Sequence, residues 1–155
     1  MKNEIRIPVR LKLSCTYPLD QNEKFTCLTD ALLVRDTEGG CALKYTETSK
    51  DAPRGTDVSI AFTEGSERVT VTRSGEVYSH MHFEADRTHP CVYRVGGHSL
   101  ALAVNTAKLE NRLRADGGGS LKLEYDIISG NEVASRVVFE LFTHAKKGED
   151  TSGGR

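Results

Sequence analysis

The sequence predicts an all-β protein: a single closed or nearly closed antiparallel up-and-down β-barrel of about 8–10 strands. Two observations predict it. Apolar and polar residues alternate along most of the chain, as they do in half-buried strands, and short clusters of turn-forming residues separate the alternating segments. Closure removes exposed sheet edges, and consecutive hairpins form a barrel directly, so we favour a barrel over a two-sheet sandwich.

The first hairpin occupies the N-terminal third of the chain. Residues 5–15 place only apolar side chains on one face, namely Ile5, Ile7, Val9, Leu11, Leu13 and Cys15. Pro8 falls on the opposite face, so this strand should lie at a sheet edge or contain a bulge there. Residues 25–35 form the next strand, and the turn at 36–40 connects it to a strand at 41–47.

The remaining strands are shorter and follow in sequence. They are predicted at residues 58–62, 69–73, 77–83, 92–95, 100–104, 121–127 and 137–141, with a loop at 86–90. Residues 107–116 are ambiguous, because the spacing of Leu109 and Leu113 suits a helix as well as a strand that continues past a bulge. We favour strand or irregular structure there. Residues 1–145 should form one barrel domain, and residues 146–155 a disordered tail.

Composition excludes several classes of protein. The chain has 155 residues, the size of one domain, with 21 basic and 22 acidic side chains and a net charge of -1. Nucleic-acid-binding domains usually carry excess basic charge, so no nucleic acid is expected as a partner. The sequence shows neither a membrane-spanning segment nor the apolar stretch of a signal peptide. We therefore expect a cytoplasmic protein with no membrane association.

The cysteines agree with a reducing compartment. Their spacing contains no C-x-x-C pair and no other paired metal-ligand motif. We expect free thiols in strands at all four positions, which are Cys15, Cys27, Cys41 and Cys91. No cofactor is expected, because no glycine pair has the spacing of a nucleotide-binding loop.

The order of several short motifs resembles the YwiB-like family of uncharacterised bacterial proteins. The motifs are Tyr45-Thr-Glu47, Arg73-Ser-Gly75, Met81-His-Phe83, Gly118-Gly119 followed by Leu-Lys-Leu-Glu-Tyr125, and Asn131-Glu-Val-Ala-Ser135. The resemblance spans about residues 5–144 and implies a calycin-like, lipocalin-related β-barrel. The chain departs from the family at Tyr93-Arg-Val-Gly96, and it has no Trp for the G-x-W motif of true lipocalins. The family has no established activity, so the resemblance implies a fold without a mechanism.

Two charged residues fall on the apolar faces of their strands. Arg73 and Glu47 both alternate with apolar neighbours, which places their side chains inside the barrel. Isolated buried charges are costly, so we expect the two to pair at one end of the interior, near Tyr45 and Tyr125. These four residues are the candidate ligand site, since a guanidinium suits an anionic or carboxylate group. The alternative is a purely structural ion pair.

His80 and His82 provide the metal candidate of the sequence. Two residues apart on a strand, they lie on one face and have a spacing that chelates zinc or nickel. Met81 and Phe83 lie on the apolar face of this strand, however, so both histidines should lie on the opposite face, toward solvent. We favour a solvated face over a metal site.

Other polar groups have simpler interpretations. No histidine has a sequence relation to a nucleophile and a carboxylate that would define a catalytic triad. Lys108, Arg112 and Arg114 form the basic cluster, but Glu110 and Asp116 dilute it, so a charged rim is favoured over a phosphate-binding surface.

The function classes that remain differ in what the barrel interior holds. The first is a cytosolic barrel that binds a small apolar or amphipathic anionic ligand. The alternative is a non-catalytic protein-interaction or regulatory module whose barrel is solidly packed. An enzyme is disfavoured, because the sequence contains no catalytic constellation. An interior pocket of about 300 Å³ or more would favour the ligand.

Association with a protein partner or a second copy is also compatible with the sequence. Val138 and Phe142 share the outward face of the last strand, where they suit a homodimer contact. Residues 107–116 are the alternative cover for this pair.

Overall fold

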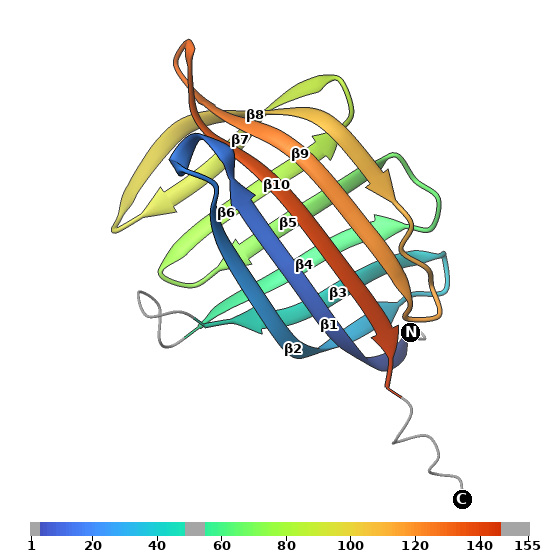
Figure 1. The fold of residues 1–155 in the computed structure, drawn as a ribbon. Coiled ribbons are helices and arrows are strands. Elements are labelled where there is room, and N and C mark those ends of the chain that lie inside the picture. The colour runs from blue at the N-terminus through green and yellow to red at the C-terminus, as the bar shows by residue number, and fades with distance from the viewer. Residues whose placement is uncertain (1–3, 49–54, 147–155) are drawn as a thin grey trace, which may run out of the picture.

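The structure, a computed structural model, describes residues 4–48 and 55–146. In this part of the chain, ten antiparallel strands form a closed up-and-down barrel (Figure 1). The strands are β1 (Ile5–Tyr17), β2 (Glu23–Arg35), β3 (Gly40–Glu47), β4 (Thr56–Thr63), β5 (Arg68–Ser74), β6 (Val77–Glu84), β7 (Arg87–Val95), β8 (His98–Asn111), β9 (Gly119–Ser129) and β10 (Glu132–Ala145). A short 3₁₀ helix, η1 (Pro18–Asp20), joins β1 to β2. Each strand pairs with its sequence neighbours, and β1 pairs with β10 to close the ring. The predicted fold class is confirmed.

Alternation along the strands builds a single core. Cross-strand partners share a face of the sheet, so Leu13 of β1 lies between Cys27 of β2 and Leu141 of β10, all facing inward. The largest fully buried side chains come from β1–β4, β9, β10 and the segment that follows β8: Leu11, Leu13, Leu33, Leu43, Ile60, Leu113, Leu121, Leu123 and Leu141. All four cysteines are free thiols in strands, as predicted.

Pro8 lies where β1 extends past its partner. Pairing with β10 begins only at Val9, opposite Ala145, whereas pairing with β2 continues through Pro8 without a shift. The Pro8 carbonyl accepts a hydrogen bond from the Lys146 backbone N–H at 3.1 Å. Pro8 therefore sits at the end of the β1–β10 ladder, at a local edge without a bulge.

The expected loop at residues 86–90 was wrong. β7 begins at Arg87, and a tight turn at Ala85 and Asp86, with Asp86 at φ 64°, connects it to β6. Pro90 suggested a loop, but it lies opposite Ala103 of β8. The β6–β7 register ends at His80 and Val92, before it reaches Pro90, so the missing N–H interrupts none of these pairs.

The ambiguous segment 107–116 is a strand that gives way to irregular structure. β8 passes a register shift between Thr106 and Lys108 and continues to Asn111. Residues 112–118, which we call the plug, then cross one end of the barrel. They contain no helix.

The plug seals its end of the barrel. Leu113 is 1% exposed and packs into the core. Arg35 donates to the Ala115 carbonyl at 2.7 Å, and the Ala115 N–H donates to Glu64 at 3.0 Å. The Thr143 hydroxyl donates to the Gly117 carbonyl at 3.2 Å. The plug is thus fixed to β2, to the β4–β5 turn and to β10.

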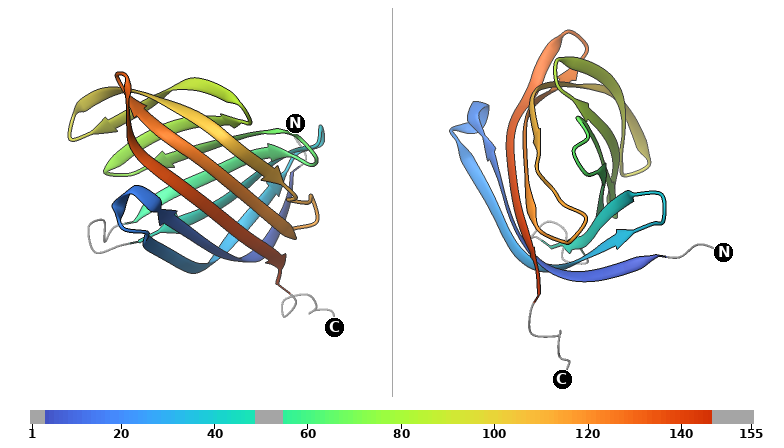
Figure 2. Two further views of the ribbon diagram at one scale, coloured as in Figure 1. Left: turned by 45° about the horizontal axis from the view of Figure 1, so that its top comes forward. Right: turned by 90° about the vertical axis from the view of Figure 1, so that its right-hand side faces the viewer.

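The opposite end carries η1 and the β5–β6, β7–β8 and β9–β10 connections, and we call it the open end (Figure 1). The β1–β2 hairpin leans outward there (Figure 2), while β1 stays paired with β10 up to Thr16. β2 pairs with β3 only from Leu32 to Arg35, so the two strands separate toward the open end. The expected C-terminal tail lies outside the described residues, apart from Lys146.

Candidate functional site

The open end of the barrel contains a cavity of about 520 Å³. Strands from all around the ring line it, with the residues Cys15, Tyr17, Phe25, Glu47, Thr48, Thr56, Arg73, Val77, Ser79, Met81, Tyr93, Tyr125, Ile127, Ser135 and Val137. Its volume lies in the range of small-molecule sites. The core is therefore packed toward the plug and hollow toward the open end.

Arg73 and Glu47 meet in the wall of this cavity. Arg73 lies opposite Val58 of β4 and the buried Ser79 of β6, so its side chain points inward. Its Nη1 contacts Oε1 of Glu47 at 2.5 Å, across the intervening strand β4. The side chains are 28% and 15% exposed. The predicted pairing of these two residues inside the barrel is present.

Arg73 keeps its charge. Burial disfavours the charged guanidinium, but Glu47, together with Tyr45, Tyr125 and Cys15, outweighs this effect and raises the pKa of Arg73 above its ordinary value. Glu47 occupies one guanidinium nitrogen, and a guanidinium has five N–H donors. The remaining donors are thus available to a polar group in the cavity.

Tyr125 and Tyr17 supply neutral hydroxyl groups to the same cavity. Tyr125 packs against Phe83, with ring centroids 4.6 Å apart, and burial raises its pKa. Burial also raises the pKa of Tyr17 to about 12, with a further contribution from Cys15. Both phenols are protonated at neutral pH and can donate or accept a hydrogen bond.

Tyr45 lies next to the ion pair but does not line the cavity. It is 6% exposed and sits in the core wall opposite Val58. Burial raises its pKa, and Arg73 and Glu47 both act on it electrostatically. Its hydroxyl group is buried without a hydrogen-bond partner among the described residues. The structure therefore places three of the four predicted residues in the cavity wall and Tyr45 behind it.

Cys15 is the cavity thiol, and it is a poor nucleophile. Burial is the main cause that raises its pKa to about 11, and the reactive form of cysteine is the thiolate. The cavity thus combines one ion pair with neutral polar groups and apolar side chains. Such a wall suits binding of an amphipathic molecule better than acid–base or nucleophilic chemistry.

Comparison with known proteins places the chain in a family. Residues 10–141 match the family described as a domain of unknown function, DUF1934. The chain belongs to the DUF1934 family. It is also similar in structure to the ywiB protein from Bacillus subtilis, whose crystal structure matches with a TM-score of 0.76 at 17% sequence identity. That match covers 92% of this chain and 94% of the other, and it shows a shared fold. No curated protein matches.

The alternation of inward and outward residues along the strands was not enough to predict most of the residues that line this cavity. It placed Cys15, Met81, Ile127 and Val137 inside the barrel, but parity gives the face of a residue and not its height along the barrel axis. Phe25 and Tyr93 had no signal that tied them to Arg73. Their height along the barrel axis could have been estimated by counting residues from the nearest turn, but this requires the ends of all ten strands.

His80 and His82 face outward, as expected. Their Nδ1 atoms lie 2.9 Å from the hydroxyl groups of Thr72 and Thr70, respectively. The structure adds His89 of β7 to this row, with its ring centroid 6.1 Å from that of His82. Burial and the two neighbouring imidazoles lower the pKa of His82. Within residues 4–48 and 55–146, no group of three or more His, Cys, Asp or Glu side chains has a metal-binding arrangement.

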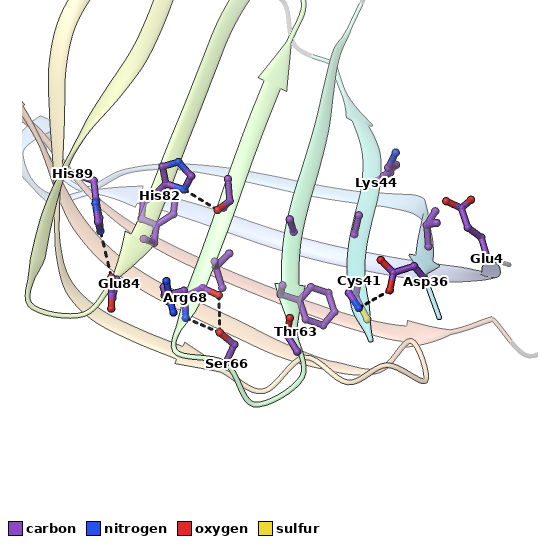
Figure 3. Close-up of a pocket in the computed structure, with 18 residues that line it drawn as sticks. Glu4, Asp36, Cys41, Lys44, Thr63, Ser66, Arg68, His82, Glu84 and His89 are labelled. Atoms are coloured by element: carbon purple, nitrogen blue, oxygen red, sulfur yellow. Dashed lines mark hydrogen bonds and ion pairs between the residues drawn. The ribbon is translucent and has the colours of Figure 1, made fainter. Parts of the chain in front are cut away.

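The histidine row borders a larger hollow of about 910 Å³ on the outer face of β3–β6 (Figure 3). Short side chains form its floor, because Ala42, Ala61 and Thr70 lie opposite one another on three successive strands. Its charged groups include Glu84, which lies 3.4 Å from His89. This hollow lies on the outside of the barrel, whereas the Arg73–Glu47 pair lies in the interior cavity, where we therefore place the candidate site.

The basic cluster is dispersed among acidic partners. Lys108 lies 3.5 Å from Glu110, and Arg114 lies 3.3 Å from Asp116. Arg94 stacks on the Tyr78 ring, with its guanidinium carbon 5.2 Å from the ring centroid.

In the described residues, no helix is long and apolar enough to cross a membrane.

Proposed function

We propose that the open end of the barrel binds a small amphipathic ligand whose polar or anionic group is held at Arg73. The observation that carries this proposal is the cavity of about 520 Å³ with the Arg73–Glu47 pair in its wall. Phe25, Met81 and Ile127 offer apolar surface to the body of the ligand. The guanidinium and the tyrosine hydroxyl groups offer hydrogen bonds to its polar end.

Glu47 competes with an anionic ligand for the guanidinium of Arg73. A carboxylate ligand must share the guanidinium with Glu47 or displace it, and two carboxylates near one cation repel each other. Replacing Glu47 with Gln removes that competitor while it preserves the shape of the side chain. The proposal therefore predicts opposite effects for changes at the two members of the pair.

The test measures binding of decanoate and 1-decanol by calorimetry, together with native mass spectrometry of the purified protein. Wild type should bind both probes. Arg73→Met should weaken decanoate binding by about tenfold or more, and 1-decanol binding less, because a charged hydrogen bond is lost. Glu47→Gln should strengthen decanoate binding. Arg136→Met is the matched control, since Arg136 pairs with Asp126 on the outer surface.

The competing function is a protein-interaction module that needs no interior ligand. If wild type binds neither probe and carries no co-purified small molecule, the ligand proposal fails and the module is favoured. If decanoate binds but Arg73→Met and Arg136→Met behave alike, the anchor at Arg73 is wrong. Residence in the cytoplasm and the absence of a nucleic-acid partner stay predictions.

A further inference from the structure

Within residues 4–48 and 55–146, one edge of β2 has no paired strand toward the open end, and we call it the free edge. β2 pairs with β1 along its whole length, from Arg35 opposite Ile5 to Glu23 opposite Tyr17. On its other side, pairing with β3 stops at Leu32. Among the described residues, no strand pairs with residues 23–31 on the side away from β1.

This edge has few of the features that usually protect exposed strands. An unpaired edge presents backbone N–H and C=O groups to any passing strand, and natural proteins block it with proline, a bulge or charged side chains such as lysine. Of these features, residues 23–31 carry charges at Glu23, Lys24 and Asp30. Residues 23–31 contain no proline, and their register with β1 has no shift. Leu28 on this edge is 62% exposed, the highest value among the large apolar side chains of the described residues.

We propose that the free edge of β2 pairs with the same edge of a second copy of this chain. The two strands run antiparallel about a two-fold axis at Cys27. This register places Lys24 opposite the partner's Asp30, and the symmetry repeats the pair. The argument for a second copy is this charge complementarity, because opposite charges directly across two strands stabilise their pairing.

The surroundings of Asp30 and Leu28 fit this arrangement. The Asp30 side chain is 61% exposed although it contacts Arg10 at 2.8 Å and Lys146 at 3.4 Å, so it has room for a further cation. Leu28 lies diagonally from the partner's Leu28, within reach across the two strands. Dimerisation thereby covers an apolar side chain that the monomer leaves in water.

The second copy also extends the wall of the cavity. Phe25 lines the cavity from the β2 side. In the proposed register the partner's Phe25 lies opposite Thr29 and faces the same way. In the proposed dimer, Phe25 of each copy lies next to the gap between β2 and β3 of the other copy.

Sedimentation of the full chain over a wide range of concentration tests the proposal. Wild type should dimerise, and Leu28→Asp should raise the dimer Kd by about tenfold or more. Phe142→Asp is the matched control, because Phe142 is 56% exposed and lies on the other side of Lys12 from Leu28. Lys24→Glu should weaken the dimer, and adding Asp30→Lys should restore it.

Cysteine crosslinking supplies a second measurement on the unmodified edge. Diamide should join Cys27 to the partner's Cys27, because the two lie directly opposite; two thiols form one disulfide while diamide takes up two electrons and two protons. Cys27→Ser should abolish the crosslinked dimer, and Cys91→Ser should not. A monomer at every concentration, or a dimer that Phe142→Asp disrupts and Leu28→Asp does not, would overturn the proposal.

Discussion

Arg73, Glu47, Cys15 and Tyr17 determine the electrostatic character of the cavity. Arg73 stays charged, whereas burial holds the thiol of Cys15 and the phenol of Tyr17 in their neutral forms. Breaking an ion pair such as Arg73–Glu47 leaves an unpaired charge that has lost its hydration, which costs more than the pair itself contributes. The cavity wall is therefore neutral overall but offers one strong, directional charge.

The thiol of Cys15 makes the stability of the protein fall at alkaline pH. Its pKa rises from 9.0 to about 11 on folding, so its contribution is complete below pH 9 and is lost as the pH rises through 11. This loss amounts to about 2–3 kcal/mol in the free energy of unfolding. Cys15→Val removes the titrating group, so urea unfolding at pH 8 and pH 11 should show a smaller loss than in wild type.

Leu13→Val is the control for this effect. Leu13 lies two residues away on the same buried face of β1 and does not titrate. Its replacement should lower stability equally at both pH values. Equal pH dependence in Cys15→Val and wild type would show that the thiol does not cause the alkaline loss.

At the scale of elements, the plug is what distinguishes the two ends of the barrel. Its backbone doubles back so tightly that the chain requires glycine. Gly119 has φ 120°, and a Cβ there would lie 2.1 Å from the Arg112 carbonyl oxygen and 2.8 Å from the Leu113 Cα. Both atoms belong to the backbone, so no side-chain rotation can relieve the clash.

Gly119→Ala should therefore destabilise the protein severely, by about 4 kcal/mol or more in urea unfolding. Gly130→Ala is the matched control, because Gly130 also has a positive φ, 63°, but has open space around its missing Cβ. Its substitution should cost about 1 kcal/mol. Similar losses for the two variants would contradict a close backbone approach at Gly119.

Strand periodicity predicted most elements, and its failures have identifiable causes. It placed the inward face of β1 from Val9 to Cys15 correctly, because one side of that strand is fully buried. It missed the first half of β7, because Pro90 signals a loop and only the divergence of β6 and β7 makes it tolerable. The plug had no period to detect, since tertiary hydrogen bonds hold it.

At the scale of the whole molecule, the barrel resembles a cup: its interior is packed at the plug and hollow at the open end. Periodicity had no access to this asymmetry, because alternation is identical in the two halves of a strand. The ion pair was predictable, since two inward charges in one core require each other. Its position in the cavity wall depended on the shared height of β3 and β5, which only the assembled register defines.

The cup predicts two levels of local stability. Amides of β9 and β10 near Leu121 and Leu141, beside the plug, should exchange with deuterium most slowly, because they lie in the packed base. Amides of β7 near Val95, at the open end, should exchange much faster. Mass spectrometry of exchanged peptides measures both, and uniform protection along the strands would contradict the two-level description.

The pairing of β1 with β10 has a consequence for the order of the strands. Because Val9 lies opposite Ala145 and Pro8 accepts a hydrogen bond from Lys146, the chain enters and leaves the barrel at adjacent points beside the plug. The ten strands form a ring in which β1 and β10 pair as neighbours, although they lie at opposite ends of the strand order. The strand order is therefore circular, and its geometry does not require the chain to begin at β1.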